Sequence, residues 1–95
     1  MQAKSSDDGS RERELKDQGT VLLHVLNRHP FDSSVWNVVS ELVGRQNRHT
    51  LEWDRYEQAA WQLVSAGLLL AGYERIKPSR QALRFNEILN ANGIL

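Results

Sequence analysis

The side chains that could carry a reaction are three histidines and twelve carboxylates, and the chain has no cysteine. His24, His29 and His49 do not follow the spacing of metal ligands, and no thiolate can join them. The carboxylates are scattered over predicted solvent faces, so they indicate no general acid–base pair. The sequence also has no glycine-rich phosphate-binding loop. We therefore expect no enzymatic activity, no metal site and no cofactor.

The charges balance over the whole chain, with twelve basic and twelve acidic residues, but they are unevenly spread. Phosphate binding depends on accumulated lysine and arginine, so a neutral chain argues against a nonspecific coat for nucleic acid. The segment 71–95 alone has a positive balance, four basic residues against two acidic ones: Arg75, Lys77, Arg80 and Arg84 against Glu74 and Glu87. Any basic patch therefore needs the C-terminal third of the chain.

The length of 95 residues, without an internal repeat, predicts one domain. Residues 1–9 are polar and offer little to bury, so we predict a disordered tail there and a folded domain over residues 10–95. No apolar run approaches the ~20 residues that span a bilayer. The polar N-terminus does not resemble a secretory signal, and we expect a cytoplasmic protein.

Two apolar patterns at helical spacing occupy the first half of the chain. The first predicts a helix over residues 20–28, and Leu15 allows it to begin as early as Ser10. It ends before Pro30, because the residue before a proline is pushed out of the helical region. The second helix ends at Gly44, and its candidate caps are Asp32, Ser33 and Ser34. The predicted inward residues are Val21, Leu22, Val25 and Leu26, then Val35, Val38, Val39, Leu42 and Val43, with Trp36 as an anchor at the core edge.

Two further helices are predicted in the second half. One is capped by Thr50 and ends at Gly67, and the last follows Pro78, which suits a first-turn position, and ends at Asn92. The inward residues of the third helix are Trp53, Tyr56, Ala59, Ala60, Leu63 and Val64. Those of the last helix are Ala82, Phe85, Ile88 and Leu89.

The segment between these helices predicts a short hairpin. The apolar triplet 68–70 indicates a strand, Ala71 and Gly72 can turn the chain, and residues 73–76 return beside the first strand. The alternative is a third helix that tolerates Gly67 and runs on to Ala71.

This order of elements resembles the winged helix-turn-helix family. The residues that carry the resemblance are Ala59, Ala60, Leu63, Val64, Ala66, Gly67, Leu68 and Leu69, then Arg75-Ile76-Lys77-Pro78-Ser79 and Ala82-Leu83. The resemblance covers about residues 18–92. It implies a mainly α fold with a small β-hairpin: three helices, a short two-stranded wing and a C-terminal helix.

The resemblance implies sequence-specific binding of duplex DNA by a small transcriptional regulator. In such proteins the second and third helices form the helix-turn-helix, and the wing touches adjacent phosphates. The residues at the base-reading positions are Asn47, Arg48, His49, Arg55 and Gln58. The wing and the following helix would add Arg75, Lys77 and Arg80 for phosphate. With so few phosphate partners, a dimer is expected.

A second hypothesis is a winged helix that binds proteins, as a homodimer or an adaptor without DNA binding. The acidic third helix favours it, because Glu52, Asp54 and Glu57 stand against Arg55 alone. The apolar residues left outside the predicted core faces are Leu15, Leu23 and Trp61, and Ile94-Leu95 adds an apolar tail. If two copies pair through the first helix, Leu15 and Leu23 would lie at the contact.

Overall fold

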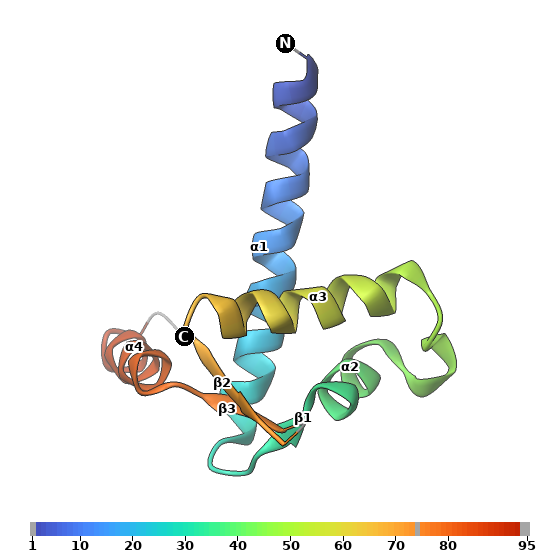
Figure 1. The fold of residues 1–95 in the computed structure, drawn as a ribbon. Helices are drawn as coiled ribbons and strands as arrows, with labels where there is room; N and C mark the ends of the chain where they lie inside the picture. The colour runs from blue at the N-terminus through green and yellow to red at the C-terminus, as the bar shows by residue number, and fades with distance from the viewer. Residues whose placement is uncertain (1, 74, 94–95) are drawn as a thin grey trace.

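The structure is a computed structural model that describes residues 2–73 and 75–93, with side chains described from residue 9 onward. In these ranges the fold is mainly helical, with four α-helices and a small three-stranded antiparallel sheet (Figure 1). The elements in chain order are α1 (Gln2–Arg28), β1 (Ser33–Ser34), α2 (Val35–Val43), a 3-10 turn (Arg45–Asn47), α3 (Leu51–Ser65), β2 (Leu69–Gly72), β3 (Arg75–Pro78) and α4 (Arg80–Ala91).

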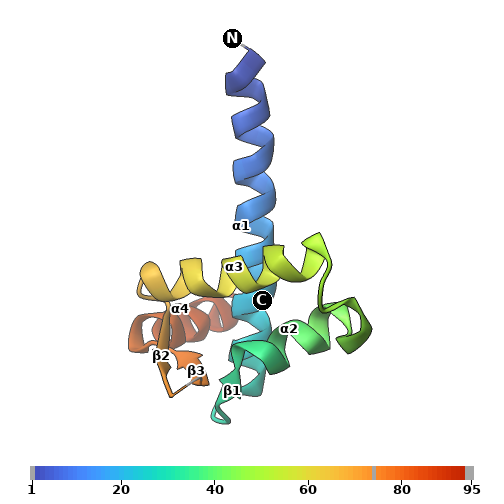
Figure 2. The ribbon, with the colours of Figure 1, turned by 45° about the vertical axis from the view of Figure 1, so that its right-hand side comes forward.

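Helix α1 is longer than the sequence predicted. It ends at Arg28, before His29-Pro30 as expected, but it begins at Gln2 rather than within the predicted domain. A helix that is already formed extends without a new nucleus, and no proline interrupts residues 2–9. The N-terminal half projects past the rest of the molecule (Figures 1 and 2). The order of residues 1–9 in solution, and hence the boundary at residue 10, stays a prediction.

The predicted caps of α2 and α3 are confirmed. The Ser34 hydroxyl accepts a hydrogen bond from the backbone N–H of Asn37 at 3.0 Å. The Thr50 hydroxyl accepts one from the backbone N–H of Trp53 at 3.3 Å. Helix α3 ends at Ser65, and Gly67 follows with φ +81°. The alternative of one helix running through Gly67 to Ala71 is therefore wrong.

The hairpin turns later than predicted. Ala71 and Gly72 are paired strand residues, with Ala71 opposite Ile76 and Gly72 opposite Arg75, and the connection starts at Tyr73. A turn at 71–72 would have set Ile76 opposite Gly67, beyond the strand. The observed register instead places Leu69, Ile76 and Pro78 on the buried face of the sheet.

Two features of the sheet correct the sequence prediction. Ser33 and Ser34 form a third strand on the free edge of β3, giving the order β1-β3-β2. A two-residue strand has no periodicity that a sequence could reveal. Pro78 ends β3 instead of opening α4, and the Ser79 hydroxyl caps α4 by accepting from the Ala82 amide at 3.2 Å.

The core lies where α1, α2, α3 and the sheet meet. Helix α3 packs across the C-terminal half of α1 (Figures 1 and 2). The buried apolar residues of this cluster are Val21, Val25, Val35, Val38, Val39, Trp53, Ala59, Ala60, Leu63, Leu69 and Ile76. Every helical residue among them was predicted to face inward.

Helix α4 departs most from its predicted packing. Ala82 is buried and Leu89 is half-buried, but Phe85 is 61% exposed and Ile88 is 47% exposed. Helix α4 lies at the side of the molecule away from α2 (Figure 1). The prediction that Phe85 and Ile88 face inward is wrong, because periodicity defines an apolar face without showing whether the same chain covers it.

The helix stop at Gly67 gives a test of the fold. Gly67→Ala should lower the free energy of unfolding by about 1–2 kcal/mol, because an L side chain is strained at this positive φ. Gly72→Ala is the control: a Cβ there would meet no atom within 4 Å, and φ is ordinary. We expect its effect to stay within ~0.5 kcal/mol. Urea unfolding followed by tryptophan fluorescence measures both, and equal losses would contradict the assigned stop.

Candidate interaction surfaces

Arg55 is held by the fold. Its Nη2 donates to Asp17 Oδ1 at 2.8 Å and its Nε donates to Asp17 Oδ2 at 3.1 Å, a bidentate pair between α3 and α1. Asp17 is only 6% exposed. The hydrogen bond to Asp17 raises the pKa of Arg55, so the guanidinium is charged throughout the working range of pH. A second hydrogen bond joins the same two helices: Gln18 Nε2 donates to Gln62 Oε1 at 2.9 Å.

Three of the other predicted base-reading residues, Asn47, Arg48 and His49, precede α3, and Gln58 lies in the middle of that helix. Arg48, His49 and Gln58 are exposed. Asn47 is half-buried, and its Nδ2 donates to the Val43 carbonyl at 2.7 Å, which links it to the end of α2. The structure thus leaves three of the five side chains open to solvent. Their role in reading bases stays a prediction.

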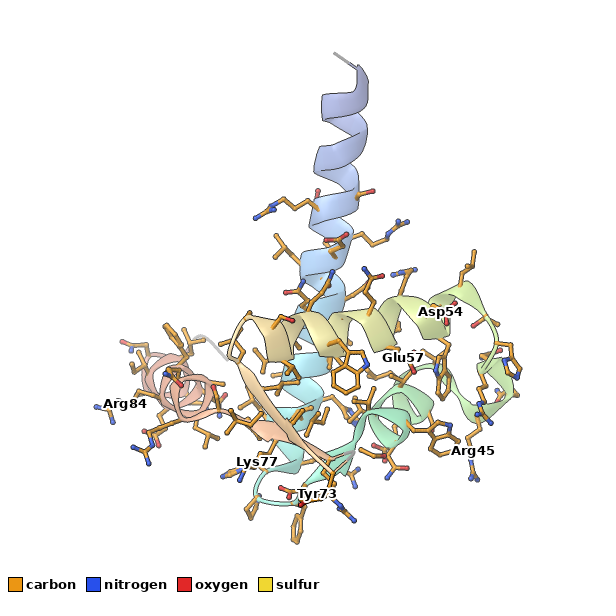
Figure 3. All side chains as sticks on the ribbon, in the orientation of Figure 1. Arg45, Asp54, Glu57, Tyr73, Lys77 and Arg84 are labelled. Atoms are coloured by element: carbon orange, nitrogen blue, oxygen red, sulfur yellow. The ribbon has the colours of Figure 1, made fainter. Side chains whose placement is uncertain are left out.

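The predicted phosphate contacts lie elsewhere. Arg75 and Lys77 are exposed on β3, and Arg80 is exposed at the start of α4. Figure 3 shows Lys77 and Tyr73 at the lower edge of the molecule and Arg84 on α4, away from Asp54 on α3. The exposed charged residues of α3 are the carboxylates Glu52, Asp54 and Glu57. The cations and the outward face of α3 therefore do not form one basic surface.

Trp61 lies on a separate aromatic surface. It is 47% exposed and lines a hollow of about 420 Å³ with Ser34, Val35 and Trp36. Trp36 was predicted as an anchor at the core edge; it lies at that edge and is 37% exposed, so the core covers it only in part. Its ring is 6.0 Å from that of the buried Trp53, and the Arg45 guanidinium lies 5.2 Å from its centroid. Trp53 of α3, which is 3% exposed, is the tryptophan that belongs to the core cluster.

An apolar groove lies between α1 and α4. It has a volume of about 340 Å³, and Asn86 is the one polar side chain in its wall. The lining residues are Gly19, Leu22, Leu23, Leu26, Leu68, Ala82, Phe85, Asn86 and Leu89. Phe85 also borders a second hollow on the outer side of α4, with Arg80, Gln81, Arg84 and Ile88.

Sequence reasoning found one side of this groove and missed the other. Leu23 was predicted at an interface and lines the groove, and Leu15 is exposed on α1 one turn before Gly19. Phe85, which lines the groove, and Ile88, which lines the second hollow, were missed because they were assigned to the core. Ile94-Leu95, the predicted apolar tail, lies outside the described residues.

The histidines and carboxylates show structural uses. His24 Nε2 lies 2.8 Å from Glu41 Oε1, and Arg28 donates to Glu41 Oε2 at 2.8 Å, which joins α1 to α2. Among residues 2–73 and 75–93, no three histidines or carboxylates gather as metal ligands would. No helix in those ranges combines the length and apolar character needed to cross a bilayer.

Comparison of the chain with protein-family models, with curated proteins and with solved structures gave no match.

The Asp17–Arg55 pair gives the second test. Asp17→Asn and Arg55→Ala should each lower the urea midpoint, and the double variant should lose less than the sum of the two, because both remove the same interaction. Glu12→Gln is the matched control on the same helix: it breaks an exposed pair with Lys16 at 3.6 Å, which contributes little. An Asp17→Asn midpoint equal to that of Glu12→Gln would contradict the structural role of the pair.

Proposed function

We propose that this chain is a winged-helix protein-interaction domain that pairs with a second copy through the α1–α4 groove. The observation that carries the proposal is the apolar groove lined by the exposed Leu23 and Phe85, with Ile88 exposed in the adjoining hollow of α4. Contiguous apolar surface of this kind marks interaction sites on soluble domains.

The order of elements supports the fold part of the proposal. Three helices precede the β2–β3 hairpin, and β3 leads through Ser79 alone into α4. This is the order that the winged helix-turn-helix resemblance implies. The same fold serves both DNA binding and protein docking, so the surfaces must decide between these functions.

The surfaces favour protein docking. In a winged helix that reads DNA, α3 would offer the base contacts, but here its exposed charges are carboxylates, which repel phosphate. Arg55, the single cation of α3, is paired with Asp17. By contrast, the α1–α4 surface is nearly uncharged along the groove.

The expected strength of pairing follows from the exposed side chains. Leu15, Leu23, Phe85 and Ile88 are between 43% and 61% exposed. Burying such a side chain fully contributes about 1.5–3 kcal/mol, so covering half of each of the four contributes about 4 kcal/mol per copy and about 8 kcal/mol per symmetric pair. Association costs about 4–15 kcal/mol. We therefore expect a reversible dimer rather than an obligate one.

Sedimentation equilibrium across a concentration series tests the pairing. The chain should shift from monomer to dimer, and Leu23→Glu should remain monomeric with unchanged helical circular dichroism, because a carboxylate would be buried in the groove. Leu70→Glu is the matched control, since Leu70 is 48% exposed on β2 and does not line the groove. A strictly monomeric wild-type chain at high concentration would refute self-association. Binding of a different protein through Trp61 would then be the remaining form of the interaction hypothesis.

Duplex DNA binding is the second candidate, and the exposed cations of the hairpin favour it. Arg75 and Lys77 alternate along β3 with the buried Ile76 and Pro78, so both face solvent, and Arg80 follows at once. Arg48 and His49 are exposed before α3. A single copy has too few phosphate contacts for tight binding. A pair of chains would double their number.

A titration with mixed duplex DNA at low salt tests this second candidate. Binding should move the backbone amide resonances of Arg75, Lys77 and Arg80, and of Arg48 and His49, and the affinity should fall as salt rises. Lys77→Glu should weaken binding several-fold, whereas Arg13→Glu on the projecting part of α1 should not. Unchanged resonances at a near-millimolar duplex concentration would leave DNA binding without support.

A further inference from the structure

An apolar stripe runs along α1 beside the groove. Leu15, Gly19, Leu22 and Leu26 recur at intervals of three and four residues, so they share one face of the helix. Gly19, Leu22 and Leu26 line the groove, and Leu15 carries the stripe one turn further along the projecting half. The stripe is interrupted by a glycine at the middle of its length.

The fold of a single chain gives no reason for this glycine. A Cβ built at Gly19 would meet no atom within 4 Å, so the chain has room for a side chain there. Glycine inside a helix lowers its stability relative to alanine. A missing side chain lets another backbone approach closely, and the distance between packed helices depends on the side chains at their contact. Gly19 is therefore a place where a helix from outside the chain can cross α1.

The groove has the length of a helix of about three turns, and its apolar wall requires that this helix present an apolar face. From Leu15 to Leu26 the stripe is about 16 Å long at 1.5 Å per residue, and the twelve residues of α4 span about 18 Å. Helix α4 offers such a face, because its Phe85 and Ile88 stay uncovered; Arg80 and Arg84 border them. The same surface thus presents the exposed apolar side chains of α4 and the apolar groove beside them. In a two-fold pair, the same surface of both copies forms the contact, so it must be complementary to itself.

We propose that α4 of a second copy crosses α1 at Gly19 and places its Phe85 in the α1–α4 groove. The partner's α4 then contacts α1 at Gly19, and α4 of the first copy contacts α1 of the partner in the same way. This proposal rests on the self-association proposed above, and it adds the crossing point and the helix that occupies the groove.

Gly19→Leu tests the crossing point. A Cβ at this position meets no atom within 4 Å, and leucine favours a helix more than glycine does, so urea unfolding at low concentration should show unchanged or higher stability. It would overpack the crossing, so the dissociation constant of the pair should rise about 10- to 100-fold in sedimentation equilibrium. Gly9→Leu is the matched control: Gly9 is also in α1 with open space at its Cβ, but lies about 80° around the helix from Gly19. It should pair like wild type.

A cross-linking experiment identifies the occupant, because the chain has no natural cysteine. Mixing the single variants Gly19→Cys and Asn86→Cys should give a disulfide-linked heterodimer, whereas mixing Gly9→Cys with Asn86→Cys should not. A wild-type dimer that Gly19→Leu leaves intact, or that cross-links equally from Gly9, would overturn the crossing at Gly19 while leaving self-association standing. A wild-type monomer would overturn both.

Discussion

The crossing of α3 over α1 is the contact on which the rest of the structure depends. It places Val21 and Val25 of α1 in one buried cluster with the small residues Ala59 and Ala60 of α3. Small side chains at a crossing let two helices approach closely. The Asp17–Arg55 pair joins the same two helices through two charge-assisted hydrogen bonds.

This crossing uses only part of α1 and none of the exposed face of α4. The sheet and α2 complete the core against α3, and α4 joins it mainly through Ser79 and Ala82 at its first turn. The remaining apolar side chains of α1 and α4 therefore face each other across an open groove. A domain of this size has too little interior to cover every apolar face that its helices carry.

The same arrangement separates the charges. The pairing with Asp17 draws the one cation of α3 toward α1, which leaves carboxylates on the outward side, while the exposed cations of β3 and α4 lie away from Asp54 (Figure 3). The exposed carboxylates of α3 would therefore repel the phosphates of DNA. A fold does not fix a function, and here the uncharged groove is a more specific feature than the topology.

The sequence by itself determined that there are four helices, and it determined the caps of α2 and α3, because these depend on local chemistry. Ser34, Thr50 and Gly67 act within a few residues, and the 3.6-residue period marks the core faces of α1, α2 and α3 without reference to distant residues. The same reasoning assigned Leu15 and Leu23 to an interface, and both are exposed. Only the tertiary structure decided the turn at Tyr73, the short strand β1, the pairing of Arg55 with Asp17 and the exposure of Phe85 and Ile88. Each of these depends on which distant segment lies opposite, and a single sequence does not record that choice.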